Sequence, residues 1–157
     1  MHAPRFLILL FVLVSAPVVT QAENATGWTV VYPASSEFED VIENIKMAVT
    51  DRGLLVSGIL HVSEMLNRTG PDLGFANEVF LKAESVEFCS ALVSHRMVVA
   101  DPSNLSICPF TVSAYVLTDA PDQVYVAYRR PHLAGSSDEA AQAAADLLDG
   151  IAREAAE

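Results

Sequence analysis

A change of hydrophobic period near Gly53 constrains the fold more than any other feature of this sequence. Before Gly53, apolar residues recur every three or four positions, as on one face of a helix: Phe38, Val41, Ile42, Ile45 and Val49. Gly53 supplies the left-handed residue that commonly ends a helix. Residues 54–62 then alternate in the manner of a strand. Because residues 28–32 also form a β-rich run, the chain is predicted to open with a strand, a helix and a second strand.

The middle of the chain predicts further strands and helices. Residues 63–66 predict a short helix begun by Ser63, and residues 70–84 predict a loop with at most a short extended piece. Residues 85–101 fit both periods, and we divide them at Ser90, a good helix N-cap. The elements expected from there on are strand 85–89, helix 91–100, and strands 107–118 and 124–130 joined by a five-residue loop.

An Ala-rich segment, residues 135–157, closes the chain after a single domain at residues 23–134. Its apolar stripe lasts barely two heptads, which favours a helix docked on its own domain over a zipper for a partner: Ala140, Ala144, Leu147, Leu148 and Ile151. Two capping-box pairs, Ser36 with Glu39 and Ser136 with Glu139, predict where the first and last long helices begin.

Residues 1–22 have the pattern of a removable signal peptide. Arg5 precedes an unbroken apolar run, and Thr20-Gln21-Ala22 places small residues at both positions that determine cleavage. The apolar stretch over residues 6–19 is shorter than the roughly 20 residues that a membrane-spanning helix needs. We therefore expect cleavage after Ala22 and an exported, soluble protein, periplasmic or secreted, with no stable membrane insertion after the signal is removed.

The charge balance narrows the classes of partner. Asp and Glu total 20 against 9 Lys and Arg, which gives a formal net charge of −11. Such an acidic surface repels phosphate backbones and anionic lipid heads. Nucleic acid is therefore not an expected partner.

Several short motifs, in this order and at this spacing, resemble the family called domain of unknown function 302. The resemblance covers residues 28–132 and is carried by the helix ending at Gly53, Ile59-Leu60-His61, Phe88-Cys89-Ser90, Met97 through Asp101-Pro102, Cys108-Pro109, and Tyr128-Arg129-Arg130-Pro131. It implies a compact α+β domain, a two-layer sandwich with helices packed on one side of a β-sheet. It brings no settled reaction and no known cofactor.

Both cysteines stand where the family pattern has hinge residues. Cys89-Ser90 replaces part of a common Phe-Gly-Asn turn, and Cys108-Pro109 replaces a common Leu-Pro pair. A disulfide between them would close a loop of 20 residues and stabilise the fold by about 3 kcal/mol. A ten-residue helix of about 15 Å between them argues for a wide separation, whereas bridged cysteines need Cα atoms within about 7 Å. An intrachain disulfide, buried free thiols and an intersubunit bond therefore all stay open.

Soft-metal or haem binding is a second interpretation of the same residues. Thiolate, imidazole and thioether ligands are available at His61, Cys89, His95, Met97 and Cys108. Their spacing matches no known metal motif, since there is no Cys-x-x-Cys and no His pair at helical spacing. A histidine at a strand end, such as His61, is more often a hydrogen-bonded structural residue.

Catalytic signals are weak. The histidines at 61, 95 and 132 could each serve as a base for a cysteine nucleophile, but no spacing brings one to a thiol. There is no Gly-x-Ser-x-Gly elbow and no Gly-rich phosphate loop. We therefore favour a protein that is not an enzyme.

Arg129-Arg130 is an adjacent arginine pair at the end of a predicted strand. Alternation sends the two side chains to opposite faces, so one can pair with an acid while the other reaches an anionic ligand, although plain surface charge is the commoner role.

The favoured function is a binding or accessory module for a small molecule or protein, with its site where His61, Cys89 and Cys108 approach the sheet. A thiol-redox or metal-binding protein that uses these residues is the alternative. A homodimer through an exposed sheet edge is a third reading.

Overall fold

The computed structural model describes residues 27–75, 77–135 and 138–157, so the predicted signal peptide and Ser136 lie outside the described residues. The elements in chain order are β1 (Thr29–Ala34), α1 (Phe38–Asp51), β2 (Leu55–His61), α2 (Val62–Thr69), the 3-10 helix η1 (Pro71–Leu73), β3 (Phe80–Cys89), α3 (Ala91–Ala100), the 3-10 helix η2 (Pro102–Ile107), β4 (Phe110–Leu117), β5 (Ala120–Arg129) and α4 (Asp138–Ala156).

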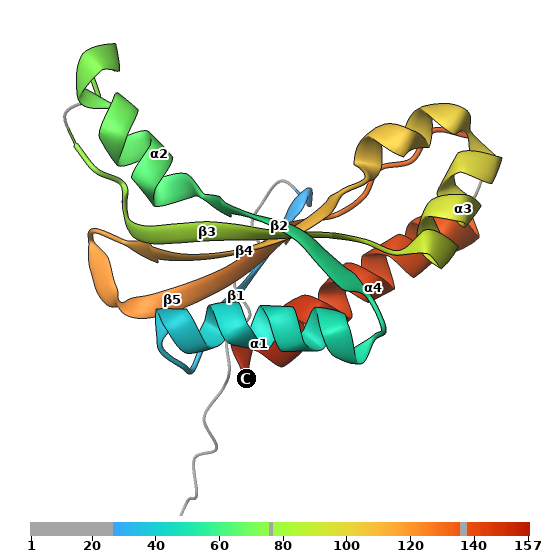
Figure 1. The fold of residues 1–157 in the computed structure, drawn as a ribbon, viewed down its shortest axis with the longest axis horizontal. Helices are drawn as coiled ribbons and strands as arrows, with labels where there is room; N and C mark the ends of the chain where they lie inside the picture. The colour runs from blue at the N-terminus through green and yellow to red at the C-terminus, as the bar shows by residue number, and fades with distance from the viewer. Residues whose placement is uncertain (1–26, 76, 136–137) are drawn as a thin grey trace, which may run out of the picture.

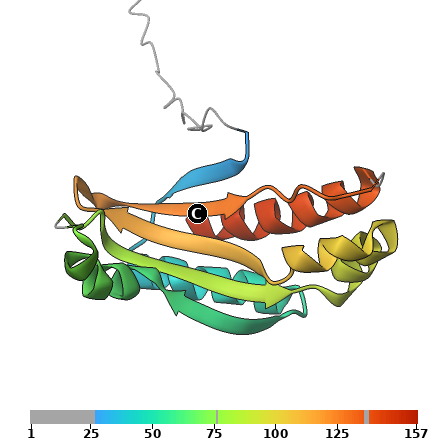
Figure 2. The same ribbon diagram turned by 90° about the horizontal axis from the view of Figure 1, so that it is seen from above.

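The strands form one antiparallel sheet in the order β1-β5-β4-β3-β2, which leaves β1 and β2 at its edges. Helices α1 and α4 lie side by side beneath one face (Figures 1 and 2). Helix α1 contacts β2, β3 and β4, and α4 contacts β1, β5 and β4. The α+β class is confirmed, with α1 and α4 as the helical layer. Helices α2 and α3 lie at opposite ends of the sheet (Figure 1).

The core lies between the sheet and the α1–α4 layer. Alternate strand residues such as Val86, Val112 and Val126 are fully buried there. All five residues of the predicted stripe on α1 are buried, and so are four of the five on α4, with Leu147 partly buried against the core. Helix α4 therefore docks on its own domain. Its alanines allow the helix axis to come close to the sheet.

Tertiary pairing lengthens two strands beyond their sequence patterns. β3 begins at Phe80 rather than at residue 85, because Phe80 and Lys82 pair with the end of β4. β5 begins at Ala120, directly opposite Leu117, so the turn is Thr118-Asp119 and the predicted five-residue loop is wrong. Residues 121–123 are accommodated by an irregularity in the β4–β5 register.

Helix capping follows the prediction at only one of the sites that the structure describes. Ser90 caps α3, since its Oγ accepts from Val93 N at 3.4 Å. The box at Ser36 and Glu39 does not form, because Glu37 is the N-cap of α1 and no side chain caps that end. Ser63 lies inside α2, and its Oγ accepts from Ala83 N at 3.0 Å instead. It thereby bonds the β3 backbone just beyond the end of β2.

Candidate functional site

The face of the sheet opposite α1 and α4, here called the open face, carries a mixture of polar and aromatic side chains. Alternation places Thr111, Ser113 and Tyr115 of β4 on it, beside Tyr125 and others of β5. Ser113 and Ser85 share a hydroxyl hydrogen bond of 2.7 Å across β3 and β4. An aromatic row crosses three strands at the α2 end, with ring centroids 5.6 Å apart for Phe80–Tyr115 and 5.3 Å apart for Tyr115–Tyr125.

A first cavity of about 660 Å³ opens at the other end of this face, where β4 begins and β5 ends. Its walls come from the start of β1, the η2–β4 connection, the first half of β4, and the end of β5 with the residues after it. One α4 side chain, Leu148, completes the lining, which includes Trp28, Thr29, Ile107, Pro109, Thr111, Ser113, Ala127, Arg129, Arg130 and His132.

The charged side chains of this lining have one sign. Arg129 and Arg130 line the cavity beside His132, and none of the described lining residues is an Asp or Glu. Glu87 lies opposite Thr111 on the open face, but it is not part of the lining. The side chain of Arg129 has no ion-pair partner among the described residues, and its residue is exposed. Within the described part of the chain, the cavity therefore presents one arginine, Arg129, that is not neutralised by an acid.

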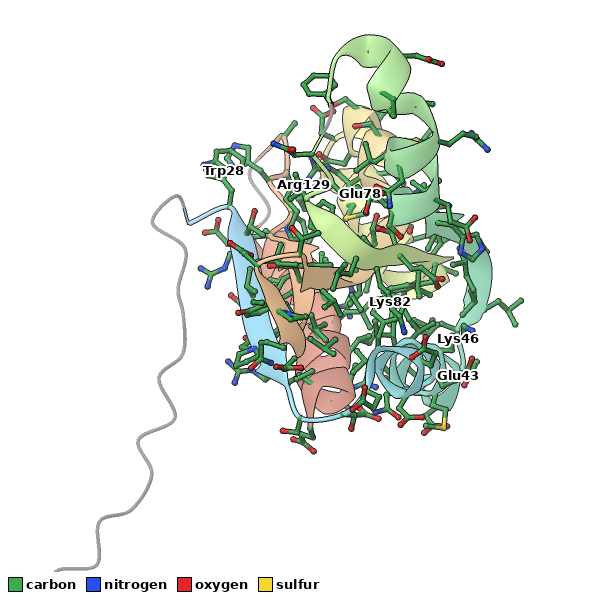
Figure 3. All side chains as sticks on the ribbon, turned by 90° about the vertical axis from the view of Figure 1, so that its left-hand side faces the viewer. Trp28, Glu43, Lys46, Glu78, Lys82 and Arg129 are labelled. Atoms are coloured by element: carbon green, nitrogen blue, oxygen red, sulfur yellow. A yellow bond between two sulfur atoms is a disulfide. The ribbon has the colours of Figure 1, made fainter. Side chains whose placement is uncertain are left out.

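Aromatic side chains stand at the mouth of the first cavity. The rings of Trp28 and His132 lie 5.3 Å apart at an angle of 53°. Trp28 is 54% exposed, so its indole is available to a ligand. The backbone N–H of Arg130 donates to the carbonyl of Trp28 at 2.8 Å, which holds the start of β1 against the end of β5. Trp28 and Arg129, whose side chains are labelled in Figure 3, both line this cavity.

The disulfide Cys89–Cys108 is formed, with Cα atoms 6.0 Å apart, and no free cysteine is present. The argument from helix length was wrong because η2 turns the chain back along α3. Buried Asn104 holds this return, since its Nδ2 donates to the carbonyls of Met97 at 2.9 Å and Ala134 at 3.1 Å. Cys108 thus lies between Ile107 and Pro109, two residues that line the first cavity.

The structure does not bring the other predicted ligands to this disulfide. His61 ends β2 and its Nδ1 lies 2.9 Å from Glu84 Oε1, whereas Leu55, at the other end of β2, lies opposite Cys89. His95 is exposed on α3, and Met97 is fully buried. Within the described ranges, no group of three or more His, Cys, Asp or Glu side chains is placed to hold a metal ion.

A second cavity of about 630 Å³ lies between β1, the end of β5 and α4, and it contains a closed polar network. Asp149 is the centre of this network. Its Oδ1 accepts from the hydroxyls of Tyr32 at 2.6 Å and Tyr128 at 2.8 Å, and its Oδ2 accepts from Arg153 Nε at 2.7 Å. The Arg153 guanidinium also lies 4.7 Å from the Tyr32 ring centroid.

This network shifts the pKa values of its members. Burial, followed by the hydrogen bond to Asp149, raises the pKa of Tyr32 to about 12, and the same causes raise the pKa of Tyr128 well above its usual range. Partial burial acts to raise the pKa of Asp149, but the hydrogen bonds from Tyr32, Arg153 and Tyr128 outweigh it and lower that pKa. At neutral pH the network therefore holds one carboxylate and two neutral phenols.

Sequence reasoning missed most residues of both cavities. The Arg129-Arg130 pair was the one sequence signal for the first cavity. Strand alternation correctly predicted that the two side chains lie on opposite faces of β5. Trp28 and His132 carried no pattern that joins them, since the two residues meet only through the β1–β5 pairing. No sequence pattern singled out Asp149.

The chain matches the family model "Domain of unknown function DUF302" over residues 28–155, which includes α4. Among solved structures, it resembles the crystal structure of an uncharacterized conserved protein DUF302 from Bacillus stearothermophilus, with a TM-score of 0.63 and 14% identity. That match covers 83% of this chain and 98% of the other. No curated protein matches the sequence. The chain belongs to the DUF302 family.

Proposed function

We propose that this chain is a binding module that holds a small organic anion in the first cavity. The observation that carries this proposal is the sign of the charge in the lining. Two arginines and a histidine line the cavity, and no acid is among its described lining residues, although Asp and Glu outnumber Lys and Arg by 20 to 9 in the chain. A local basic site on an acidic molecule concentrates an anion at that site.

Arg129 supplies the recognition of the anionic group. A guanidinium offers several N–H donors in a planar fork, which matches two oxygens of a carboxylate, sulfonate or phosphate. Because no described acid pairs with Arg129, a ligand does not have to displace an internal partner. Thr111 and Ser113 add hydroxyl groups, which are neutral and can hydrogen-bond, to the lining of the cavity.

The rest of the lining favours a flat apolar body attached to the anion. The Trp28 and His132 rings border the cavity, and the side chains of Ile107 and Pro109 form an apolar wall. Binding sites for small molecules commonly combine such walls with a few polar groups that set the orientation of the ligand. The ligand class is therefore an organic anion with an aromatic or similarly flat portion.

We also infer that the protein works outside the cytoplasm. The signal-peptide pattern of residues 1–22 supports export. The Cys89–Cys108 disulfide supports it as well, because disulfides persist mainly in oxidising compartments. Among the described residues, no helix is long and apolar enough to cross a bilayer.

The fluorescence of Trp28 tests the anion site directly, because it is the single tryptophan of the chain and borders the cavity. Benzoate and phenyl phosphate are titrated at constant ionic strength, with benzyl alcohol as the neutral probe. We expect a saturable fluorescence change with both anions at roughly millimolar concentration. We expect benzyl alcohol to bind at least about tenfold more weakly, because it lacks the charge that Arg129 recognises.

Two variants complete this test. Arg129→Ala should weaken benzoate at least about tenfold and change the free energy of unfolding by less than about 0.5 kcal/mol. Arg68→Ala removes an exposed arginine from α2, at the other end of the sheet, and should bind as the wild type does. Equal binding of benzoate and benzyl alcohol, or full binding by Arg129→Ala, would reject the proposed function.

A further inference from the structure

We propose that two copies of this chain associate through the free edge of β2 and the adjoining helix α2. Strand β2 pairs only with β3 among the described strands, so one side of its backbone has no partner in the sheet. Figure 2 shows β2 at the outer edge, with no described strand beyond it. Such an edge presents N–H and C=O groups that can pair with another strand.

The two edges of the sheet differ in how they are protected. β1 contains Pro33, and the Tyr32 hydroxyl beside it is bonded to Asp149 of α4. β2 contains no Pro, Lys or Arg, and two of its apolar residues are exposed, Leu55 at 81% and Leu60 at 48%. Proline and charge are common ways to stop edge pairing. The β2 edge lacks both, so it is the edge suited to association.

Helix α2 extends the apolar surface of this edge. It follows β2 directly and has no buried residue. Met65 and Leu66 are 38% and 41% exposed, and the ring of Phe75 just beyond the helix is 71% exposed. A stable interface buries about 800 Å² on each partner, more than a seven-residue edge supplies. The bulge at Ser57 also limits how far a regular ladder can run, so α2 must contribute to the interface.

Charge favours a second copy of the chain as the occupant. Two molecules with a net charge of −11 repel one another over most of their surfaces. The β2 edge avoids this repulsion, because His61 is its only ionisable residue and is already paired with Glu84. Beyond the ends of β2, Glu64 and Arg68 lie on α2, and Asp51 lies beside Arg52, whose Nη1 is bonded to Glu154.

Symmetry also favours a second copy of this chain as the partner of the β2 edge. An antiparallel pair of identical strands is related by a two-fold axis, so each copy offers the other the same groups. Pairing of β2 with β2 would join two five-stranded sheets into one continuous sheet. The antiparallel arrangement would bring Asp51 and Arg52, before β2 of one copy, towards Glu64 and Arg68, after β2 of the other copy.

Sedimentation equilibrium of the full chain over about 1 to 200 µM tests this inference. We expect the mass to approach twice that of one chain at the upper concentrations. Leu60→Lys places a like charge at the edge of both copies and should raise the dimer dissociation constant at least about tenfold. Met65→Lys tests the helix without altering the sheet. Circular dichroism checks that each variant is folded.

The matched control is Leu92→Lys, which changes a residue that is 63% exposed on α3, at the opposite end of the sheet. It should dimerise as the wild type does. A wild-type chain that stays monomeric at the highest concentration overturns the inference. The inference is also overturned if neither Leu60→Lys nor Met65→Lys changes the dimer dissociation constant. Arg129→Ala should not alter the mass, so failure of the anion site and failure of the dimer are separable.

Discussion

The two cavities that border β5 have similar volumes, about 660 and 630 Å³, but they use their charged groups in opposite ways. In the second cavity Asp149 accepts hydrogen bonds from two phenols and an arginine, so its charge is committed to holding α4 on the sheet. In the first cavity Arg129 meets no described acid. Charge that the fold satisfies contributes stability, whereas charge that it leaves unsatisfied is available for a ligand.

Strand alternation explains how one dipeptide serves both cavities. Arg129 points to the open face, whereas Arg130 lies close enough to Tyr32 and Tyr128 to act on their pKa values from the other side of the strand. Arg130 also lines both cavities and has an interaction within the protein. Substitutions at residues that belong to one cavity and not to the other can therefore test the two roles separately.

The largest expected effect comes from removing the disulfide beside the first cavity. The double variant Cys89→Ser/Cys108→Ser should lose about 3 kcal/mol of unfolding free energy, because the unfolded chain regains the freedom of a 20-residue loop. Urea unfolding measures this loss. Benzoate binding should also weaken, since Ile107 and Pro109 flank Cys108 in the cavity wall.

The second cavity should keep its stabilising network in that background. Asp149→Ala should lower the free energy of unfolding by the same amount with and without the disulfide. The disulfide joins the end of β3 to the residue after η2, whereas the Asp149 network joins α4 to β1 and β5, and the effects of separate sites add. A loss below about 1 kcal/mol for the double serine variant would contradict the role given to the disulfide.

A smaller effect is expected from Asp149→Ala, which removes the shared acceptor of the second cavity. The free energy of unfolding should fall by about 2 kcal/mol, because hydrogen bonds to a partly buried carboxylate are lost. Asp146→Ala is the matched control, because Asp146 lines the same cavity but accepts a hydrogen bond from exposed Gln142 and not from the network. This substitution should lower the free energy of unfolding by less than about 0.5 kcal/mol.

The difference in unfolding free energy between the wild type and Asp149→Ala should become smaller at acidic pH. The pKa of Asp149 is lowered in the fold, so its contribution is present above the unfolded pKa of the carboxyl group and is lost as the pH falls through the folded value. Unfolding measured from neutral to acidic pH checks this sign. A difference that stays constant throughout would show that the carboxylate charge is not the cause.

The smallest expected effect is a change in stability that appears only at alkaline pH, when Tyr32 loses its proton. Its pKa is raised from 10.0 to about 12, so its neutral phenol stabilises the fold fully below about pH 10, and this contribution is lost as the pH rises through about 12. Phenolate absorbance of wild type minus Tyr32→Phe isolates this group. In Asp149→Ala the same difference should move towards the ordinary value, and an unshifted Tyr32 in the wild type would contradict the network.

Prediction from sequence succeeded where the physical signal is local. Phe38, Val41 and Ile45 lie on one face of α1 because helical spacing places them there, and the structure buries all three. Ser90 caps α3 through its own side chain. The boundaries failed where a distant strand decided them, as at Phe80, whose partner Leu117 lies far along the chain.

The candidate site was predictable only in part for the same reason. The sequence could place Arg129 and Arg130 on opposite faces, but it could not show that acids meet one side and not the other. The set His61, Cys89, His95 and Cys108 was grouped by chemistry alone. β2 runs antiparallel to β3, so His61 lies at the far end from Cys89.

The sequence by itself determined the α+β class, the family, the apolar faces of α1 and α4, and the negative formal net charge, because composition and hydrophobic period can be read from the chain without its fold. Only the tertiary structure decided that η2 returns Cys108 to Cys89, that Trp28 meets His132, and that Asp149 receives two tyrosines. These contacts join residues far apart in the chain. Their partners are chosen by sheet register and helix docking, which depend on the packing of the whole core.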